Sequence, residues 1–268
     1  MLRPRIIPCL LVHNQGLVKT VEFGQPKYVG DPINAVRIFN EKEVDELIVL
    51  DIDATVLGRE PNFELIEHLA SECRMPLCYG GGVKTCQQIE KIIGLGVEKV
   101  AISSALFENE TTIAQAKATV GSQSIVAVLD VRKTASEAGY EVFTHNGSRA
   151  TGRSPLEMAR RFAELGVGEI VINSIDRDGA MQGYDLDLFA QIKSAVQVPL
   201  TCLGGAGSMS HVAELVARFG PVGAAAGSMF VFKGALKAVL INYPTARAKA
   251  LLVPSKGAAE SGVPQVLR

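Results

Sequence analysis

The fold is decided by a stretch of seven residues that occurs twice: Leu47-Ile48-Val49-Leu50-Asp51-Ile52-Asp53 and, 123 positions later, Ile170-Val171-Ile172-Asn173-Ser174-Ile175-Asp176. The same offset relates Pro76-Leu77 to Pro199-Leu200, Gly81-Gly82 to Gly204-Gly205, and Phe107 to Phe230. A strand predicted at residues 6–12 returns at 125–131, at a slightly shorter offset. Two similar sequences fold alike, so the repeat predicts a duplicated half-barrel with two related ligand sites.

Short, nearly unbroken apolar runs alternate with amphipathic helical patterns along the chain. The runs lie at residues 6–11, 47–52, 77–81, 99–103, 125–130, 169–174, 199–203 and 223–227. Such strands are typical of parallel sheets buried on both faces, and the helices between them indicate an α/β fold. We therefore predict a single (β/α)8 TIM barrel over residues 1–245, with eight helices outside and a tail at 246–268. A doubly wound sheet is the alternative, which the twofold repeat and the lack of a GxGxxG turn disfavour.

Composition excludes several classes of partner. The 268 residues are 47% hydrophobic and 21% charged, with a net charge of −1, so we expect no nucleic-acid partner. No apolar run reaches the roughly 18 residues of a membrane helix, and no signal peptide precedes the first strand. The five cysteines form no CxxC pair and the four histidines have no ligand spacing. We expect a cytoplasmic protein with reduced thiols, without a metal or a cofactor.

Glycines and serines follow four of the predicted strands in matching positions. They are Gly80-Gly81-Gly82, Ser103-Ser104, Gly204-Gly205-Ala206-Gly207 and Gly227-Ser228. Glycine lets backbone N–H groups approach a phosphate, and loops after the last two strands often cradle one in TIM barrels. Tight turns without a ligand are the alternative. Two symmetric sets, each with a serine, favour two phosphate sites.

Carboxylates end three of the predicted strands, at the mouth where barrel active sites lie. They are Asp51, Asp53, Asp130, Asp176 and Asp178. They could act as general acids or bases, or form ion pairs with neighbouring basic residues. Asp130 ends an otherwise apolar strand, which favours a catalytic role for it. Two long connections, residues 12–30 and 131–153, leave the same end, and loops of this length are usually functional lids or disordered.

Charged residues also begin four of the predicted strands: Arg5, Glu46, Lys99 and Glu169. They converge on the opposite, N-terminal mouth of the barrel. A salt-bridge ring that stabilises the barrel is one interpretation. The other is a closed channel, because two cations and two carboxylates can block a pore while every charge stays paired.

Six motifs, read together, identify a family. They are Arg5-Ile6-Ile7-Pro8-Cys9-Leu10, Gly30-Asp31-Pro32, Asp45-Glu46-Leu47, Gly80-Gly81-Gly82, Ser174-Ile175-Asp176-Arg177-Asp178-Gly179 and Gly204-Gly205-Ala206-Gly207. Residues 1 to about 245 thereby resemble the cyclase subunit of imidazole glycerol phosphate synthase, of histidine biosynthesis. The resemblance implies a barrel that binds a ligand with a phosphate at each end. It also implies a glutaminase partner on the N-terminal face and ammonia passing through the barrel.

The resemblance assigns roles to individual positions. The four ring residues match the family's ammonia gate, and Asp130 matches one of its two catalytic aspartates. We expect ligand binding by Lys19, Asp51, Gly81, Gly82, Ser103, Ser104, Asp178, Gly179, Gly204, Gly205, Gly227 and Ser228. The second catalytic aspartate falls on position 11, which is leucine, and a family lysine falls on His13. Ser103-Ser104 stands where the family has an asparagine and a threonine.

Leu11 cannot transfer a proton, so paired acid–base chemistry across the barrel is not available. A chain that keeps the gate but lacks this acid resembles a paralogue branch found with sugar amidotransferases, as does Leu240-Ile241-Asn242-Tyr243-Pro244. In that branch, a glutaminase and a cyclase-like barrel supply ammonia to a third enzyme, which makes an acetamidino group on a surface-polysaccharide (O-antigen) sugar.

Two other functions stay open at this point. One is a true cyclase, a lyase that converts the phosphoribulosyl aminoimidazole carboxamide substrate and ammonia to imidazole glycerol phosphate. The other is a non-catalytic barrel that binds a phosphorylated ligand.

Overall fold

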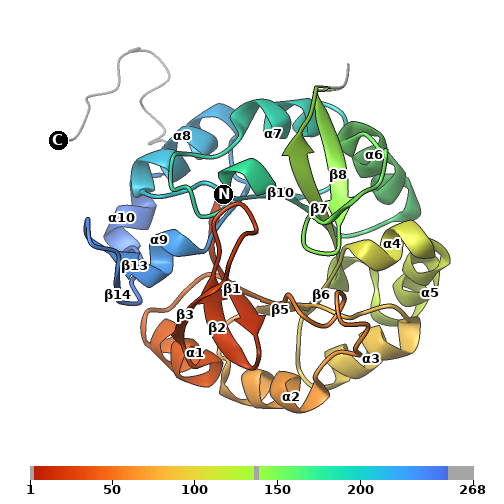
Figure 1. Cartoon of the computed structure of the whole chain (residues 1–268), viewed down its shortest axis with the longest axis horizontal. Coiled ribbons are helices and arrows are strands. Elements are labelled where there is room, and N and C mark those ends of the chain that lie inside the picture. The colour runs from red at the N-terminus through yellow and green to blue at the C-terminus, as the bar shows by residue number, and fades with distance from the viewer. Residues whose placement is uncertain (1–2, 136–138, 253–268) are drawn as a thin grey trace.

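Eight parallel strands close into a barrel, as the apolar runs predict. The computed structural model describes residues 3–135 and 139–252. The barrel strands are β1 (Arg5–His13), β4 (Leu47–Asp51), β5 (Leu77–Gly80), β6 (Lys99–Ile102), β7 (Ile125–Lys133), β10 (Glu169–Ser174), β11 (Leu200–Leu203) and β12 (Gly223–Ala226). They pair in the order β10-β11-β12-β1-β4-β5-β6-β7, and β7 pairs with β10 to close the ring (Figure 1).

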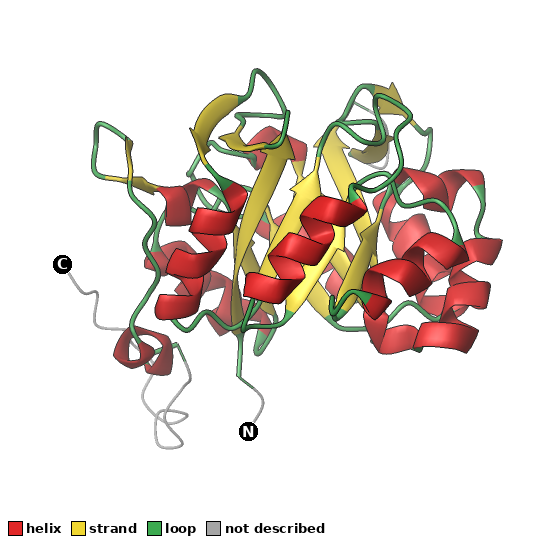
Figure 2. Cartoon of the chain, turned by 90° about the horizontal axis from the view of Figure 1, so that it is seen from below, coloured by secondary structure: helices red, strands yellow, loops and turns green. Residues whose placement is uncertain are grey.

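Helices surround the strands on the outside (Figures 1 and 2). They are α1 (Pro32–Glu41), α2 (Phe63–Glu72), α3 (Cys86–Gly94), α4 (Ser104–Glu108), α5 (Thr111–Val120), α6 (Pro155–Leu165), α7 (Leu186–Lys193) and α8 (Met209–Phe219). Short 3-10 turns occupy Ser122–Ser124 and Ile175–Arg177. Local sequence explains the helix ends: the Asp31 carboxylate accepts the Asn34 N–H at 2.8 Å with Pro32 next to it, and Gly166 ends α6 in the left-handed region.

The duplication is visible in the strand register. Cys9 pairs with Ile48 in the first half, and Val128 pairs with Val171 in the second. These pairs are related by the two sequence offsets. The strand pairs β1–β4 and β7–β10 therefore share one register, so side chains at equivalent positions can be compared directly.

The long connections contain antiparallel strands. The sequence alone does not predict these strands, because it indicates lids or disordered loops for both connections. The first carries β2 (Gly16–Lys19) and β3 (Lys27–Gly30), and the second β8 (Tyr140–Thr144) and β9 (Arg149–Ala150). The chain turns back directly at the end of β1 because Asn14 and Gln15 adopt positive φ. Figure 2 shows these extensions above the carboxyl ends of the barrel strands. Residues 136–138 of the second connection lie outside the described residues.

The last of the eight predicted helices, which follows β12, is short. The segment after β12 forms α9 (Ser228–Val231), the hairpin β13 (Phe232–Lys233) and β14 (Ala238–Val239), and α10 (Ala246–Ala250). Of the tail placed at 246–268, residues 253–268 lie outside the described residues. Within the described ranges, no helix has the length and hydropathy required to span a bilayer.

The core has two layers. One fills the space between strands and helices; the other fills the inside of the barrel and comprises Ile7, Cys9, Ile48, Cys78, Ala101, Val126, Val128, Val171, Leu203 and Ala225. All eight barrel strands contribute to this inner cluster. All five cysteines are free thiols. The inside of the barrel is thus apolar between its two polar mouths.

Candidate functional site

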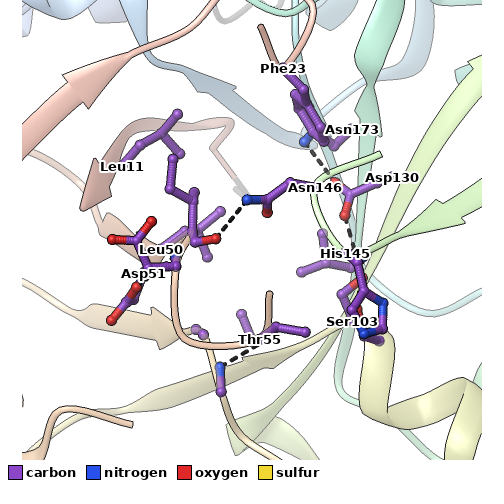
Figure 3. Close-up of a pocket in the computed structure, with 18 of the residues that line it drawn as sticks. Leu11, Phe23, Leu50, Asp51, Thr55, Ser103, Asp130, His145, Asn146 and Asn173 are labelled. Carbon is purple, nitrogen blue, oxygen red and sulfur yellow. Dashed lines mark hydrogen bonds between the residues drawn. The ribbon is translucent and has the colours of Figure 1, made fainter. Parts of the chain in front are cut away.

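A pocket of about 320 Å³ opens at the carboxyl ends of the barrel strands (Figure 3). It extends down to Cys9, Ala101 and Val128 of the inner cluster. The expected site residues that line it are Lys19, Asp51, Gly81, Gly82, Ser103, Ser104, Asp130, Asp178 and Gly227. Gly179, Gly204, Gly205 and Ser228 follow β10, β11 and β12 at the same end but are not part of this lining.

Asp130 carries a carboxyl group of the pocket whose pKa lies well above its ordinary value. Its Oδ1 accepts a hydrogen bond from Asn173 Nδ2 at 2.8 Å, and its Oδ2 accepts one from Ser103 Oγ at 3.4 Å. Burial raises the pKa of Asp130 to about 6, which these two hydrogen bonds oppose. A carboxyl group with this pKa can both donate and accept a proton near neutral pH.

The position symmetric to Asp130 is apolar. Leu11 and Leu50 pack against the inner cluster and line the pocket. Figure 3 shows them across the pocket from Asp130. Asp51, next to Leu50, accepts the backbone N–H groups of Asp53 and Ala54 at 2.9 and 3.0 Å, and burial raises its pKa. Positions 11 and 130 therefore do not provide a pair of proton-transfer groups that face each other across the pocket.

His13 and Asp53 form a pair on the pocket wall that sequence reasoning did not anticipate. His13 Nδ1 lies 2.7 Å from Asp53 Oδ1, and Asp53 Oδ2 accepts the backbone N–H of Asn14 at 2.8 Å. The second half repeats the backbone contact, because Asp176 accepts the N–H of Lys133 at 2.7 Å. The aspartate thus ties two strand ends together in both halves, and the histidine is an addition in the first half only. The sequence repeat relates Asp53 to Asp176, so it could have indicated this shared backbone contact.

Lys19 is buried at the pocket edge, with 6% of its surface exposed. Its Nζ donates to the carbonyl of Cys9 at 2.6 Å, and burial lowers its pKa. A β-carbon at Gly227 would lie 2.5 Å from this Nζ. Asp178 accepts from Thr20 Oγ1 at 2.7 Å, so the first connection is fastened to the second half at Thr20.

Close approach explains the glycines after β5 and β11. Gly81 has φ +121°, and a β-carbon there would lie 2.4 Å from the carbonyl oxygen of Asp51. Gly205 has φ +101°, and its β-carbon would lie 2.1 Å from the carbonyl oxygen of Gly183. These contacts alone require glycine at both positions, whether or not a phosphate binds there. The Gly82 N–H is held by Thr55 Oγ1 at 3.2 Å.

The second connection brings further polar groups to the pocket, none of them among the expected site residues. His145 donates its backbone N–H to Ser104 Oγ at 3.2 Å, and Asn146 Nδ2 donates to the carbonyl of Ile52 at 2.6 Å. Both residues have positive φ. Asn146 thereby links the second half to the first across the mouth (Figure 3). Their position at the end of β8 gave no sequence signal, because the connection was read as a loop.

The four charged residues at the other mouth form one closed network, as their positions predict. Lys99 Nζ donates to Glu46 at 2.7 Å and to Glu169 at 2.9 Å. Arg5 pairs with Glu46 and donates to Glu169 at 2.8 Å. Glu46 is 4% exposed and Glu169 is 5% exposed, so both carboxylates are buried and the two cations cover them. Burial opposes the charge on Glu169, but the hydrogen bond and charge of Arg5 lower its pKa.

Comparison with known proteins then decides the family. The family model described as "Histidine biosynthesis protein" matches residues 5–237. The chain belongs to the histidine biosynthesis protein family. The described residues of this family member contain no group of three or more His, Cys, Asp or Glu side chains that could hold a metal ion.

Relatives within the histidine biosynthesis family align over nearly their whole length. A protein of Leptospira borgpetersenii is 53% identical over 254 residues, covering 95% of this chain and 100% of the relative. A protein of Vibrio vulnificus is 58% identical over 245 residues, covering 91% and 94%. A protein of Pseudomonas aeruginosa is 55% identical over 244 residues, covering 91% and 97%. Their names, all provisional, are imidazole glycerol phosphate synthase subunit HisF, hisF3 and hisF2 respectively.

Proposed function

We propose that the chain is the barrel subunit of a glutamine-dependent amidotransferase system. It receives ammonia from a glutaminase docked on the N-terminal face. It passes the ammonia to a sugar amidotransferase that makes an acetamidino group for surface-polysaccharide biosynthesis. The observation that carries the proposal is a complete charged ring beneath an apolar barrel, combined with leucine at the position symmetric to Asp130.

The barrel interior has the chemistry that ammonia transfer requires. Neutral ammonia can enter an apolar interior, whereas a cation would lose its hydration without replacement. The ring keeps each buried carboxylate paired while the barrel is closed. Lys99 contacts both carboxylates through a single flexible side chain, so its displacement would open the ring while Arg5 still pairs with Glu46 and Glu169. The names of two relatives, numbered hisF2 and hisF3, support a role beside another copy of the subunit.

The test compares two nitrogen sources in the reconstituted three-protein system. Lys99→Ala should impair the glutamine-dependent formation of product more than the ammonium-dependent formation, with the fold intact. The control is Lys237→Ala, at an exposed lysine next to the β14 strand, which should leave both routes unchanged. Equal loss on both routes, or no complex with any glutaminase encoded nearby, would exclude the channel and leave a barrel that only binds a phosphorylated ligand.

One observation favours a second function, the cyclase of histidine biosynthesis. Asp130 is retained with its pKa raised by burial to about 6, and a general acid or base poised near neutrality suits ring closure. In that case Asp130 would act without a carboxylate at position 11. The test is growth without histidine of a mutant that lacks the cyclase subunit, carrying this chain. Full complementation would favour the cyclase over the sugar pathway.

A further inference from the structure

The C-terminal segment returns to the barrel mouth that carries the charged ring. It leaves α9, forms the β13–β14 hairpin, and ends in α10 close to the lower edge of the barrel (Figures 1 and 2). Within it, Tyr243 packs against Phe230 with ring centroids 5.5 Å apart. The motif that contains Tyr243 has no role in the pocket.

The two halves differ where Tyr243 meets the barrel. In the second half, the N–H of Gly168 donates directly to the carbonyl of Ile125 at 2.9 Å. The equivalent residues of the first half are Asp45 and Ile6. Between them lies the Tyr243 hydroxyl, which accepts from the Asp45 N–H at 3.1 Å and donates to the Ile6 carbonyl at 2.8 Å. The hydroxyl thus replaces one direct backbone hydrogen bond by two.

Side chains lock this inserted hydroxyl in place. The Asp45 carboxylate accepts the Ile6 N–H at 2.9 Å through Oδ2 and Lys249 Nζ at 2.7 Å through Oδ1. Lys249 Nζ also lies 5.0 Å from the centroid of the Tyr243 ring. Ile6, Asp45 and Tyr243 form a closed cycle of three hydrogen bonds, and Lys249 neutralises its charge.

The cycle is adjacent to two members of the ring. Ile6 follows Arg5 and Asp45 precedes Glu46, and these two neighbours form the ion pair of the first half. A change in the spacing between Ile6 and Asp45 therefore changes the spacing of Arg5 and Glu46. The second half shows the alternative arrangement, in which the two backbones bond directly without an intervening hydroxyl.

We propose that Tyr243 and Lys249 are positioning residues for the charged ring, and that the C-terminal segment couples a partner on this face to the ring. This inference rests on the proposed function for its catalytic consequence. The described part of the segment joins the two strand starts, because Tyr243 bonds to both Ile6 and Asp45 and Lys249 bonds to Asp45.

The main variant is Tyr243→Phe, which keeps the aromatic packing and removes only the hydroxyl. Its matched control is Tyr140→Phe, which removes a hydroxyl that donates to Asp185 at 3.1 Å. The Tyr140 contact lies at the opposite end of the barrel from the ring. A second pair is Lys249→Met and Arg247→Met, since Arg247 is exposed on the same helix. The lysine variant serves if Tyr243→Phe does not fold.

Two readouts separate positioning from simple stabilisation. In the isolated chain, NMR resonances of the Arg5 side chain and the Glu46 amide should shift in Tyr243→Phe and Lys249→Met, but not in the controls. In the reconstituted system, the ratio of glutamine-dependent to ammonium-dependent turnover should change about fivefold, the effect of one hydrogen bond. The thermal midpoint is measured for all four variants.

The outcomes are distinguishable. If Tyr243→Phe and Lys249→Met lower the thermal midpoint while the resonances and the ratio stay unchanged, the segment only stabilises the fold and the inference is overturned. If the resonances shift but the wild-type chain binds no glutaminase, the positioning role stands and the proposed function fails.

Discussion

Replacing Asp130 by asparagine should stabilise the folded chain above about pH 4 and should not have this effect at lower pH. Burial raises the pKa of this carboxyl group from 3.8 to about 6. Below pH 4 the group is protonated in both the folded and the unfolded chain, so it causes no difference. Between pH 4 and 6 the unfolded chain releases the proton while the folded chain retains it, so the wild type loses stability as the pH rises. Above pH 6 the loss is complete and constant.

The size of the stability difference follows from the pKa shift of Asp130. A pKa that is higher by about 2 corresponds to about 3 kcal/mol, and we expect about 1.5–3 kcal/mol because the side chain still faces the open pocket. Asparagine keeps the hydrogen bond from Asn173 through its carbonyl oxygen, and its amide can donate to Ser103. The substitution therefore removes the charge with little change in packing.

The assay is urea unfolding at pH 4, 5, 6 and 7, with the free energy of unfolding compared between Asp130→Asn and wild type. The difference in the free energy of unfolding should be smallest at pH 4, grow between pH 4 and 6, and reach its full size at pH 7. Leu11→Asn is the matched control, because it places an amide at the symmetric position and leaves Asp130 in place; its difference from wild type should not depend on pH. A constant difference for Asp130→Asn, or one that shrinks as the pH rises, would refute the reasoning.

Two further predictions concern the mouth of the barrel at the carboxyl ends of its strands. Crystals soaked in high phosphate should show an ion at Gly82 and Ser104 and another at Gly205 and Ser228; density at neither site would refute the phosphate assignment. The purified chain should show little cyclase turnover with ammonia, because loss of one acid–base group typically lowers the rate by a factor on the order of 10²–10⁴. Leu11→Asp should raise that turnover, whereas rapid turnover by the unmodified chain would contradict the prediction.

The barrel could be predicted from the sequence because its signals are local. Each strand is buried on both faces, so it appears as an apolar run regardless of what lies elsewhere in the chain. The repeat then supplied long-range information, since the register of Cys9 with Ile48 returns as Val128 with Val171. The charged ring followed from the same reasoning, because parallel strands bring their first residues to one mouth.

The remaining features depend on contacts between distant residues. β8 alternates buried and half-buried residues over only five positions, too few to distinguish a strand from a loop. His13 and Asp53 are 40 positions apart, and nothing at either position alone indicates the pairing. Tyr243 and Ile6 are further apart still. Such pairings form only when the barrel closes, so no single segment of the sequence predicts them.

The inserted hydroxyl also bears on how the chain is made. Ile6 and Tyr243 are separated by 237 positions, so a ribosome needs on the order of 10–50 s to deliver the second after the first. β1 meanwhile lacks its β12 neighbour and presents an unpaired edge. The second half bonds Gly168 to Ile125 within its own sequence. The half synthesised first is therefore the half whose last contacts form at the end of translation.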